Sequence, residues 1–264
     1  MVKLKEGIYQ HFRPEEASMI DSLWDLAGRA QDEYRPILTH FLNPRQQYLA
    51  KVVADTIEVK LAFAGGLDAS EHKRALFYPE YYQPEDSDFS LALLEIKYPV
   101  KFAQLQHGRV LGTLANCGLD REVLGDILTD GVRFQVVCEQ EIATYLENNI
   151  DRIGKIKVRL VELALTEIIN PLTEWEQTTL ILASKRCDTV IAAAYNLSRK
   201  HVKDLLAADK VNLNWVLQNK ADLEIGLHDI ISVRGYGRIR LDELTGISKK
   251  GKLIAQVSVL RKTR

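Results

Sequence analysis

Among the residues of this sequence, the basic side chains near residue 200 have the types and spacing that best fit a binding site. Arg199 and Lys203 lie four positions apart, so on a helix they would share one face, and Lys200 flanks them. Guanidinium and ammonium groups gathered on a short helical face can bind the phosphates of a nucleic acid. The ordinary alternative for such a run of charges is a solvated face without a ligand.

Two helices must hold this face in place. The sequence predicts one helix over LASKRCDTVIAAAY and a second over SRKHVKDLLAADK, joined by a two-residue turn. Ser198 is a good N-cap for the second helix, and Val202, Leu205 and Leu206 form its apolar stripe. Arg199 and Lys203 would therefore point away from the core, where both could reach one phosphate strand.

The net charge of the 264-residue chain is −1, but its two ends differ. Residues 183–264 hold 16 Lys/Arg and 8 Asp/Glu, whereas residues 1–182 hold 19 Lys/Arg and 28 Asp/Glu. The basic excess in the last third favours a polyanionic ligand there. An acidic N-terminal region could instead bind a protein partner.

The remaining elements divide the chain into further parts. Residues 1–85 read as an α/β N-terminal unit. Residues 86–165 follow the order βαββαβ, which is that of a ferredoxin-like or RRM-like domain. An RRM stacks RNA bases on aromatic side chains of its central strands, but the matching strand here offers only Phe134, so we expect no stacking platform. Residues 166–182, with Pro171 and several glutamates, read as a linker.

Side chains for catalysis or metal binding do not occur at the required spacings. The three cysteines form no CxxC pair, no histidine lies in HExxH, and no nucleophile–base set is recognisable. The pair Gly65–Gly66 lacks the GxxxxGK[ST] pattern of a phosphate loop. We interpret it as a turn that ends a strand, with an RNA contact through Lys73 or Arg74 as the alternative. We expect no enzyme activity, no cofactor and no metal.

The basic residues and the turn that we expect to touch RNA extend over the whole C-terminal region. Ser198 would cap its helix and could contact a phosphate oxygen, and Asn214 and Trp215 would shape a turn or touch a sugar. The expected RNA-binding residues are Arg186, Ser198, Arg199, Lys200, Lys203, Lys210, Asn214, Arg234, Arg238, Lys249, Lys250 and Lys252.

This region resembles the S4 RNA-binding domain. That pattern has Arg-Leu-Asp opening one helix, Ser-Arg opening the next, a Lys-Val-x-Val-Asn-Gly strand and turn, and a Gly-Asp-x-Ile strand. The corresponding segments here are Arg186-Cys187-Asp188, Ser198-Arg199, Lys210-Val211-Asn212-Leu213-Asn214-Trp215 and His228-Asp229-Ile230-Ile231. Trp215 and His228 stand where the pattern has glycine, so we expect those turns to differ. The resemblance implies an S4-like domain over residues 183–264, ending in a basic hairpin through Lys249–Lys252, and hence an α+β chain.

The whole chain resembles the YlmH family, through AFAGGLDASEHKRALFYP and HGRVLGTLANCGLDREVLGDIL followed by the S4-like region. The resemblance implies a cytoplasmic RNA-binding protein. Its S4 domain would bind ribosomal RNA and tRNA on the large ribosomal subunit during ribosome-associated quality control. Genes of this family often lie beside cell-division genes, so the rival hypothesis is a protein-interaction factor in cell division whose RNA binding is incidental.

A third hypothesis comes from residues 240–246. RLDELTG is similar to the catalytic motif of pseudouridine synthases, in which Asp242 would be the catalytic residue. Only 22 residues follow Asp242, too few for a catalytic domain, so we set this reading aside. The sequence also has no run of about 18 apolar residues, and we expect no membrane insertion.

Overall fold

The structure is a computed structural model that describes residues 12–171 and 175–261. The chain divides into two compact units, Met1–Leu172 and Thr173–Arg264, here called the first and the second unit. None of the described helices is both long enough and apolar enough to cross a bilayer.

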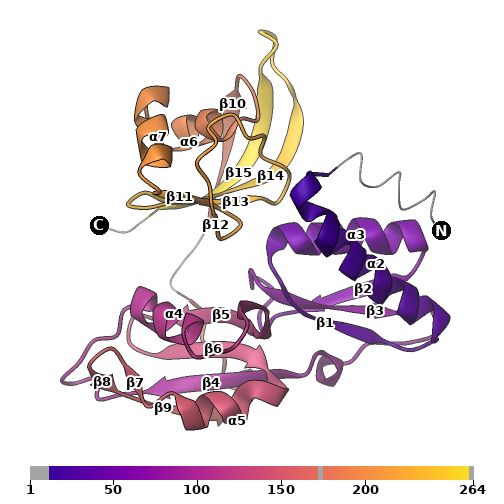
Figure 1. Cartoon of the computed structure of the whole chain (residues 1–264), viewed down its shortest axis with the longest axis vertical. Coiled ribbons are helices and arrows are strands. Elements are labelled where there is room, and N and C mark those ends of the chain that lie inside the picture. Colours follow the sequence, from indigo (N-terminus) through magenta and orange to yellow (C-terminus); the bar gives the residue numbers. More distant parts are fainter. Residues whose placement is uncertain (1–11, 172–174, 262–264) are drawn as a thin grey trace. The chain divides into compact units, whose positions relative to one another are not determined.

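The first unit begins with two helices packed on a small antiparallel sheet (Figure 1). The second helix begins with a capping box, in which Asn43 Oδ1 accepts from Gln46 N at 3.0 Å and Pro44 is the first helical residue. The sheet has the order β1-β3-β2. These elements are η1 (Pro14–Glu16), α2 (Ala17–Asp32), β1 (Ile37–Leu42), α3 (Pro44–Ile57), β2 (Lys60–Ala64) and β3 (Lys73–Tyr78).

The first unit continues in a four-stranded antiparallel sheet of order β5-β6-β4-β9, whose strands and helices follow the expected βαββαβ order. Helices α4 and α5 pack on one face of it, and a short hairpin, β7–β8, precedes its last strand. These elements are η2 (Asp86–Phe89), β4 (Leu91–Lys97), α4 (His107–Ala115), η3 (Arg121–Val123), β5 (Leu124–Thr129), β6 (Phe134–Glu139), α5 (Gln140–Asn149), β7 (Arg152–Ile153), β8 (Ile156–Lys157), β9 (Arg159–Leu163) and η4 (Leu165–Glu167).

The other face of this four-stranded sheet is also buried. Leu93 and Val137 on that face are fully buried in a cluster with Phe41 of β1 and Leu76 of β3. The Phe41 ring lies so close to Gly125 of β5 that a Cβ built there would be 2.8 Å from it. The two sheets of the first unit therefore share one apolar core.

The second unit is a six-stranded antiparallel sheet with two helices on one face. Strand order is β10-β15-β14-β13-β11-β12, and the long β14–β15 hairpin extends beyond the helices (Figure 1). The elements are β10 (Glu176–Leu182), α6 (Cys187–Tyr195), α7 (Arg199–Ala207), β11 (Val211–Leu213), β12 (Val216–Leu217), β13 (Ile230–Val233), β14 (Gly237–Ile247) and β15 (Leu253–Arg261).

The linker expected over residues 166–182 differs from the structure at both of its ends. Ile169 is buried in the core shared by the two sheets of the first unit. Strand β10 pairs with β15 from Glu176 to Leu182, so it belongs to the second unit. Its first four residues are exposed and polar because β10 is an edge strand, and this made them read as a linker.

Candidate nucleic-acid interface

A basic groove lies at one end of the six-stranded sheet, with a volume of about 680 Å³. Strands β11 and β13 pair at Val211 and Val233, which brings the residues just outside them together. The backbone N–H of Arg234 donates to the carbonyl oxygen of Lys210 at 2.8 Å. Lys210 and Arg234, which are distant in sequence, therefore lie side by side in the lining of the groove.

Two more arginines reach the same groove from β14 and β15. Arg238 pairs across the sheet with Leu260, and Arg261 pairs with Gly237. Arg261 is more than half exposed, lies over the Tyr195 ring and has Glu176 at 3.7 Å. The groove thus holds four cations, while Asp209 is the carboxylate among its lining residues, so it suits a phosphate backbone.

Gly237 keeps this end of the sheet narrow. A Cβ built at Gly237 would lie 1.9 Å from the carbonyl oxygen of Leu260, and its φ is +132°. A side chain at this position would force the two strands apart. Glycine is therefore needed for Arg238 and Arg261 to line one groove.

Arg199 is exposed on α7, as its spacing predicted, but its guanidinium also binds a buried carboxylate. Its Nη2 donates to Asp188 Oδ2 at 2.6 Å, and Arg186 Nε donates to the same carboxylate at 3.2 Å. The Asp188 side chain is fully buried, and burial alone would raise its pKa. The hydrogen bonds from Arg186 and Arg199 outweigh this and hold the pKa of Asp188 below its usual value. Both arginines thus neutralise a buried charge, although each keeps an exposed part.

The other expected residues fall into three further positions. Ser198 caps α7, with its Oγ accepting from His201 N at 3.1 Å, and Lys200 and Lys203 are exposed on that helix. Lys249, Lys250 and Lys252 lie exposed at the tip of the β14–β15 hairpin. The structure therefore brings Lys210, Arg234 and Arg238 together in one groove, and the cations of α7 and of the hairpin tip are not among the residues that line it. Arg261 was not expected in this site, because its place depends on the β14–β15 register.

The side chain of Asn214 stabilises the turn between β11 and β12 through two hydrogen bonds. Its Nδ2 donates to the buried Asp229 at 2.8 Å, and its Oδ1 accepts from Ile230 N at 2.9 Å. Asn214 and Trp215 form the two-residue turn with φ of +47° and +68°, and His228 has φ of +63°. The turns keep the left-handed conformation that glycine favours, although Trp215 and His228 stand at these positions.

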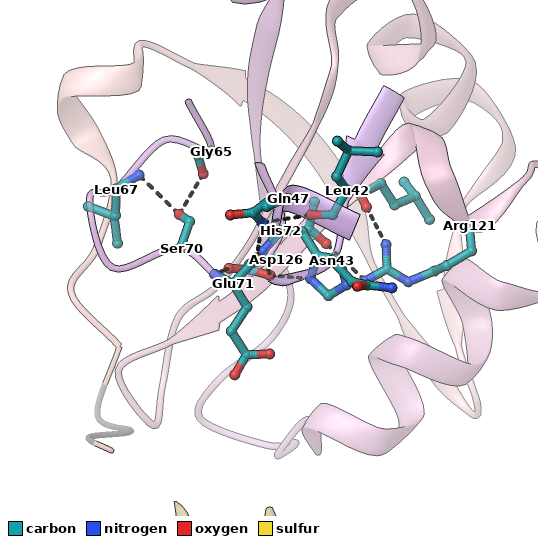
Figure 2. A network of polar contacts seen from close by, with 12 residues as sticks. Leu42, Asn43, Gln47, Gly65, Leu67, Ser70, Glu71, His72, Arg121 and Asp126 are labelled. Carbon is teal, nitrogen blue, oxygen red and sulfur yellow. Dashed lines mark hydrogen bonds and ion pairs between the residues drawn. The ribbon is translucent and has the colours of Figure 1, made fainter. Parts of the chain in front are cut away.

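The glycine turn at Gly65–Gly66 is held by polar contacts within the first unit (Figure 2). Ser70 Oγ donates to Gly65 O at 2.7 Å, and Asp126 accepts from Glu71 N and from the His72 ring, both at 2.7 Å. Burial would raise the pKa of Asp126, but these hydrogen bonds hold it below its usual value. The turn is therefore a structural tie between β3 and β5.

The two cations beside this turn are also engaged within the fold. Arg74, which we considered for RNA, is buried and donates to the carbonyl oxygens of Thr39 and Phe89. Lys73 Nζ donates to Asp68 O at 2.6 Å. Glu71, His72 and Asp126 offer ligand atoms within 4.8 Å of one another, but the Asp126 carboxylate already accepts from His72 and two backbone N–H groups.

The chain is similar to known proteins both in sequence and in structure. Residues 84–167 match a family model described as "Putative RNA-binding domain in YlmH". The chain is 34% identical over 245 residues to the Ribosome-associated protein quality control protein P2 of Bacillus subtilis, covering 93% of this chain and 95% of that protein. A solved structure, the cell division protein ylmH from Streptococcus pneumoniae, is 39% identical with a TM-score of 0.53, and covers 61% of this chain and 99% of its own.

Proposed function

This chain belongs to the YlmH family, and on that premise we propose that it binds RNA on the large ribosomal subunit, where it contacts ribosomal RNA and tRNA in ribosome-associated quality control. The observation that supports this most is the groove of Lys210, Arg234, Arg238 and Arg261. The name of the Bacillus subtilis relative supports the ribosome as the place of action, which would be the cytoplasm.

The second unit is the part that we assign to RNA, as an S4-like module. The residues that carry the S4 resemblance hold one another: Asp188 accepts from Arg199, and Asp229 accepts from Asn214. The residues of the S4-like pattern thus stabilise the fold of the second unit. The cations that line the groove would bind the phosphates of the RNA. Because the groove, α7 and the hairpin tip each carry exposed cations, one RNA molecule could be held at several phosphates.

Co-sedimentation with large ribosomal subunits over a series of salt concentrations tests this function. Changing Lys210 and Arg234 to Ala removes two groove cations, and we expect weaker association. The slope of log K against log salt should become shallower by roughly 1.4–1.8, since each neutralised phosphate contributes about 0.7–0.9. The matched control changes Lys185 and Lys220 to Ala, which removes two cations of the same unit outside the groove. Equal binding by both double variants would contradict the groove assignment.

The cell-division hypothesis stays open because the Streptococcus pneumoniae structure bears that name. In that function the first unit would bind a protein, and the association would survive high salt. A pull-down with the full chain separates the two: particles released by salt support RNA binding, and a salt-resistant protein partner supports the rival.

We propose no catalytic role for the RLDELTG segment. Asp242 Oδ1 accepts from Arg240 at 2.5 Å, and Oδ2 accepts from Ser258 at 2.6 Å, so its carboxylate is engaged within the sheet. Asp242→Ala should leave the uridine modification of ribosomal RNA unchanged, as measured by mass spectrometry of cellular RNA. Loss of one specific pseudouridine would revive the synthase hypothesis.

A further inference from the structure

An apolar patch is left exposed on the first unit, where β4 leads into α4. Phe102 is 89% exposed, Val100 52% and Val132 55%, and these three residues are here called the Phe102 patch. They border a hollow of about 440 Å³ together with Tyr98 and Lys101. A fully exposed Phe is unusual, since burying such a side chain stabilises a fold by about 1.5–3 kcal/mol.

The backbone around Phe102 is fixed by hydrogen bonds. Phe102 N donates to Pro99 O at 2.9 Å, and Ala103 N donates to the same oxygen at 3.0 Å. The Tyr98 hydroxyl donates to Val132 O at 2.5 Å, which ties this loop to the turn between β5 and β6. Leu105, three residues on, is buried in the core under α4. The ring of Phe102 is therefore presented outward by an ordered loop.

The segment that carries Val100 and Phe102 is basic, in contrast to the rest of the acidic N-terminal region, and Asp130 is the carboxylate beside the patch, where it accepts from Val132 N. Residues 96–119 contain three Lys/Arg and no Asp or Glu. Lys101, directly before Phe102, is exposed, and so are His107 and Arg109 at the start of α4. A protein partner with acidic side chains is one match for such a surface, and a nucleic acid is the other.

Of these two partners, a nucleic acid is favoured, because both faces of the four-stranded sheet are buried and RNA must bind elsewhere on this domain. Residues 84–167 match a family model for RNA binding, yet Phe134 is in the core beneath the helices, and the opposite face is covered by β1 and β3. The surface through which an RRM stacks bases is thus closed in this chain. An exposed, pre-ordered aromatic ring beside lysine is the arrangement with which proteins hold unpaired bases.

We propose that an unpaired RNA base stacks on Phe102, with Lys101 contacting a neighbouring phosphate. This inference deepens the proposed function, on which it rests: it adds to the phosphate contacts of the second unit a contact that requires a single-stranded stretch. A paired helix offers no free base face, so the Phe102 patch selects loops, bulges or ends.

The test uses the full chain and labelled single-stranded poly(U), with binding followed by fluorescence anisotropy. Phe102→Ala should weaken binding about tenfold, and Phe102→Leu should weaken it as much, because leucine keeps an apolar side chain but has no π face. Phe102→Trp should keep the affinity, and its added indole fluorescence should be quenched when RNA binds. Tyr81→Ala, which removes another exposed aromatic ring of the first unit, is the matched control and should bind as the unchanged chain does.

Each other outcome overturns the inference. Unchanged binding by Phe102→Ala, with loss in the Lys210→Ala/Arg234→Ala variant, would leave the proposed function standing and remove the stacking contact. Binding by Phe102→Leu equal to that of the unchanged chain would show an apolar contact without stacking. Failure of the unchanged chain to bind either poly(U) or ribosomal subunits would overturn the proposed function as well. Circular dichroism checks the fold of each variant.

Discussion

Asp188 of α6 is completely buried, and its Oδ2 lies 2.6 Å from Nη2 of Arg199 on α7. This pair joins the two helices of the second unit, with Arg186 contacting the same carboxylate. An arginine that neutralises a buried charge has a stabilising role before it has any role in binding.

Arg199→Glu should therefore unfold the second unit at a lower temperature. It would place a carboxylate beside buried Asp188, and loss of one partner of a buried pair costs about 3 kcal/mol or more. Scanning calorimetry of the full chain measures the transition. Arg199→Lys keeps the positive charge but loses the bidentate contact, so its transition midpoint should lie between those of the unchanged chain and Arg199→Glu. An unchanged midpoint for Arg199→Glu would show that Arg186 alone satisfies Asp188.

Lys203 is the better position for testing the exposed face of α7. Lys203→Glu leaves the apolar stripe of the helix intact, so the fold should survive while association with ribosomal subunits weakens. The salt slope should become shallower by about one. Lys220→Glu, a reversal at another exposed lysine of the second unit, is the control. If both variants bind alike, the α7 face is only solvated.

The Trp215→Gly variant tests whether Trp215 matters for the backbone conformation of the β11–β12 turn or for contacts of its indole ring. The left-handed φ of +68° costs an L-residue about 1 kcal/mol, which glycine avoids, so the free energy of unfolding should rise. If Trp215 touches RNA, affinity should fall in the same variant. Urea unfolding and poly(U) binding measure the two quantities. Lower stability would mean that the contacts of the indole outweigh the strain.

Acid should weaken the first unit partly through Glu95. Burial raises the pKa of Glu95, but hydrogen bonds from Arg133 and Lys97 outweigh this and lower it from 4.5 to about 2. Its stabilising contribution is therefore complete above about pH 4.5 and is lost as the pH falls towards 2. Glu95→Gln should be less stable at pH 7, and it should lose less stability than the unchanged chain between pH 5 and 3. If calorimetry shows that Glu95→Gln and the unchanged chain lose equal stability between pH 5 and 3, this prediction is wrong.

Local signals in the sequence predicted much of the fold. The N-cap at Ser198 depends on neighbouring residues, and α7 begins after it as expected. Strand β10 was missed because its exposed edge position allows polar residues, which resemble those of a linker. Phe134 was recognisable as the lone aromatic of its strand, but its burial depends on packing against distant helices.

The candidate site was predicted less completely, since it depends on contacts between distant segments. Spacing on one helix showed that Arg199 and Lys203 share a face. It did not show that Asp188, eleven residues earlier, would bind Arg199. Likewise, Lys210 and Arg234 meet only because β11 pairs with β13. Residue types indicated RNA as a class of ligand to test, while strand register decided which cations line one groove.

The apolar core between the two sheets of the first unit has a consequence for the order in which the chain is made. Phe41 and Leu76 leave the synthesising ribosome long before Val137 and Ile169, with which they pack. At about 5–20 residues per second, the first sheet must wait several seconds with its apolar face uncovered. The N-terminal elements therefore depend on later residues for their solubility. A nascent chain stalled between β3 and β6 should be the form most exposed to chaperones and proteases.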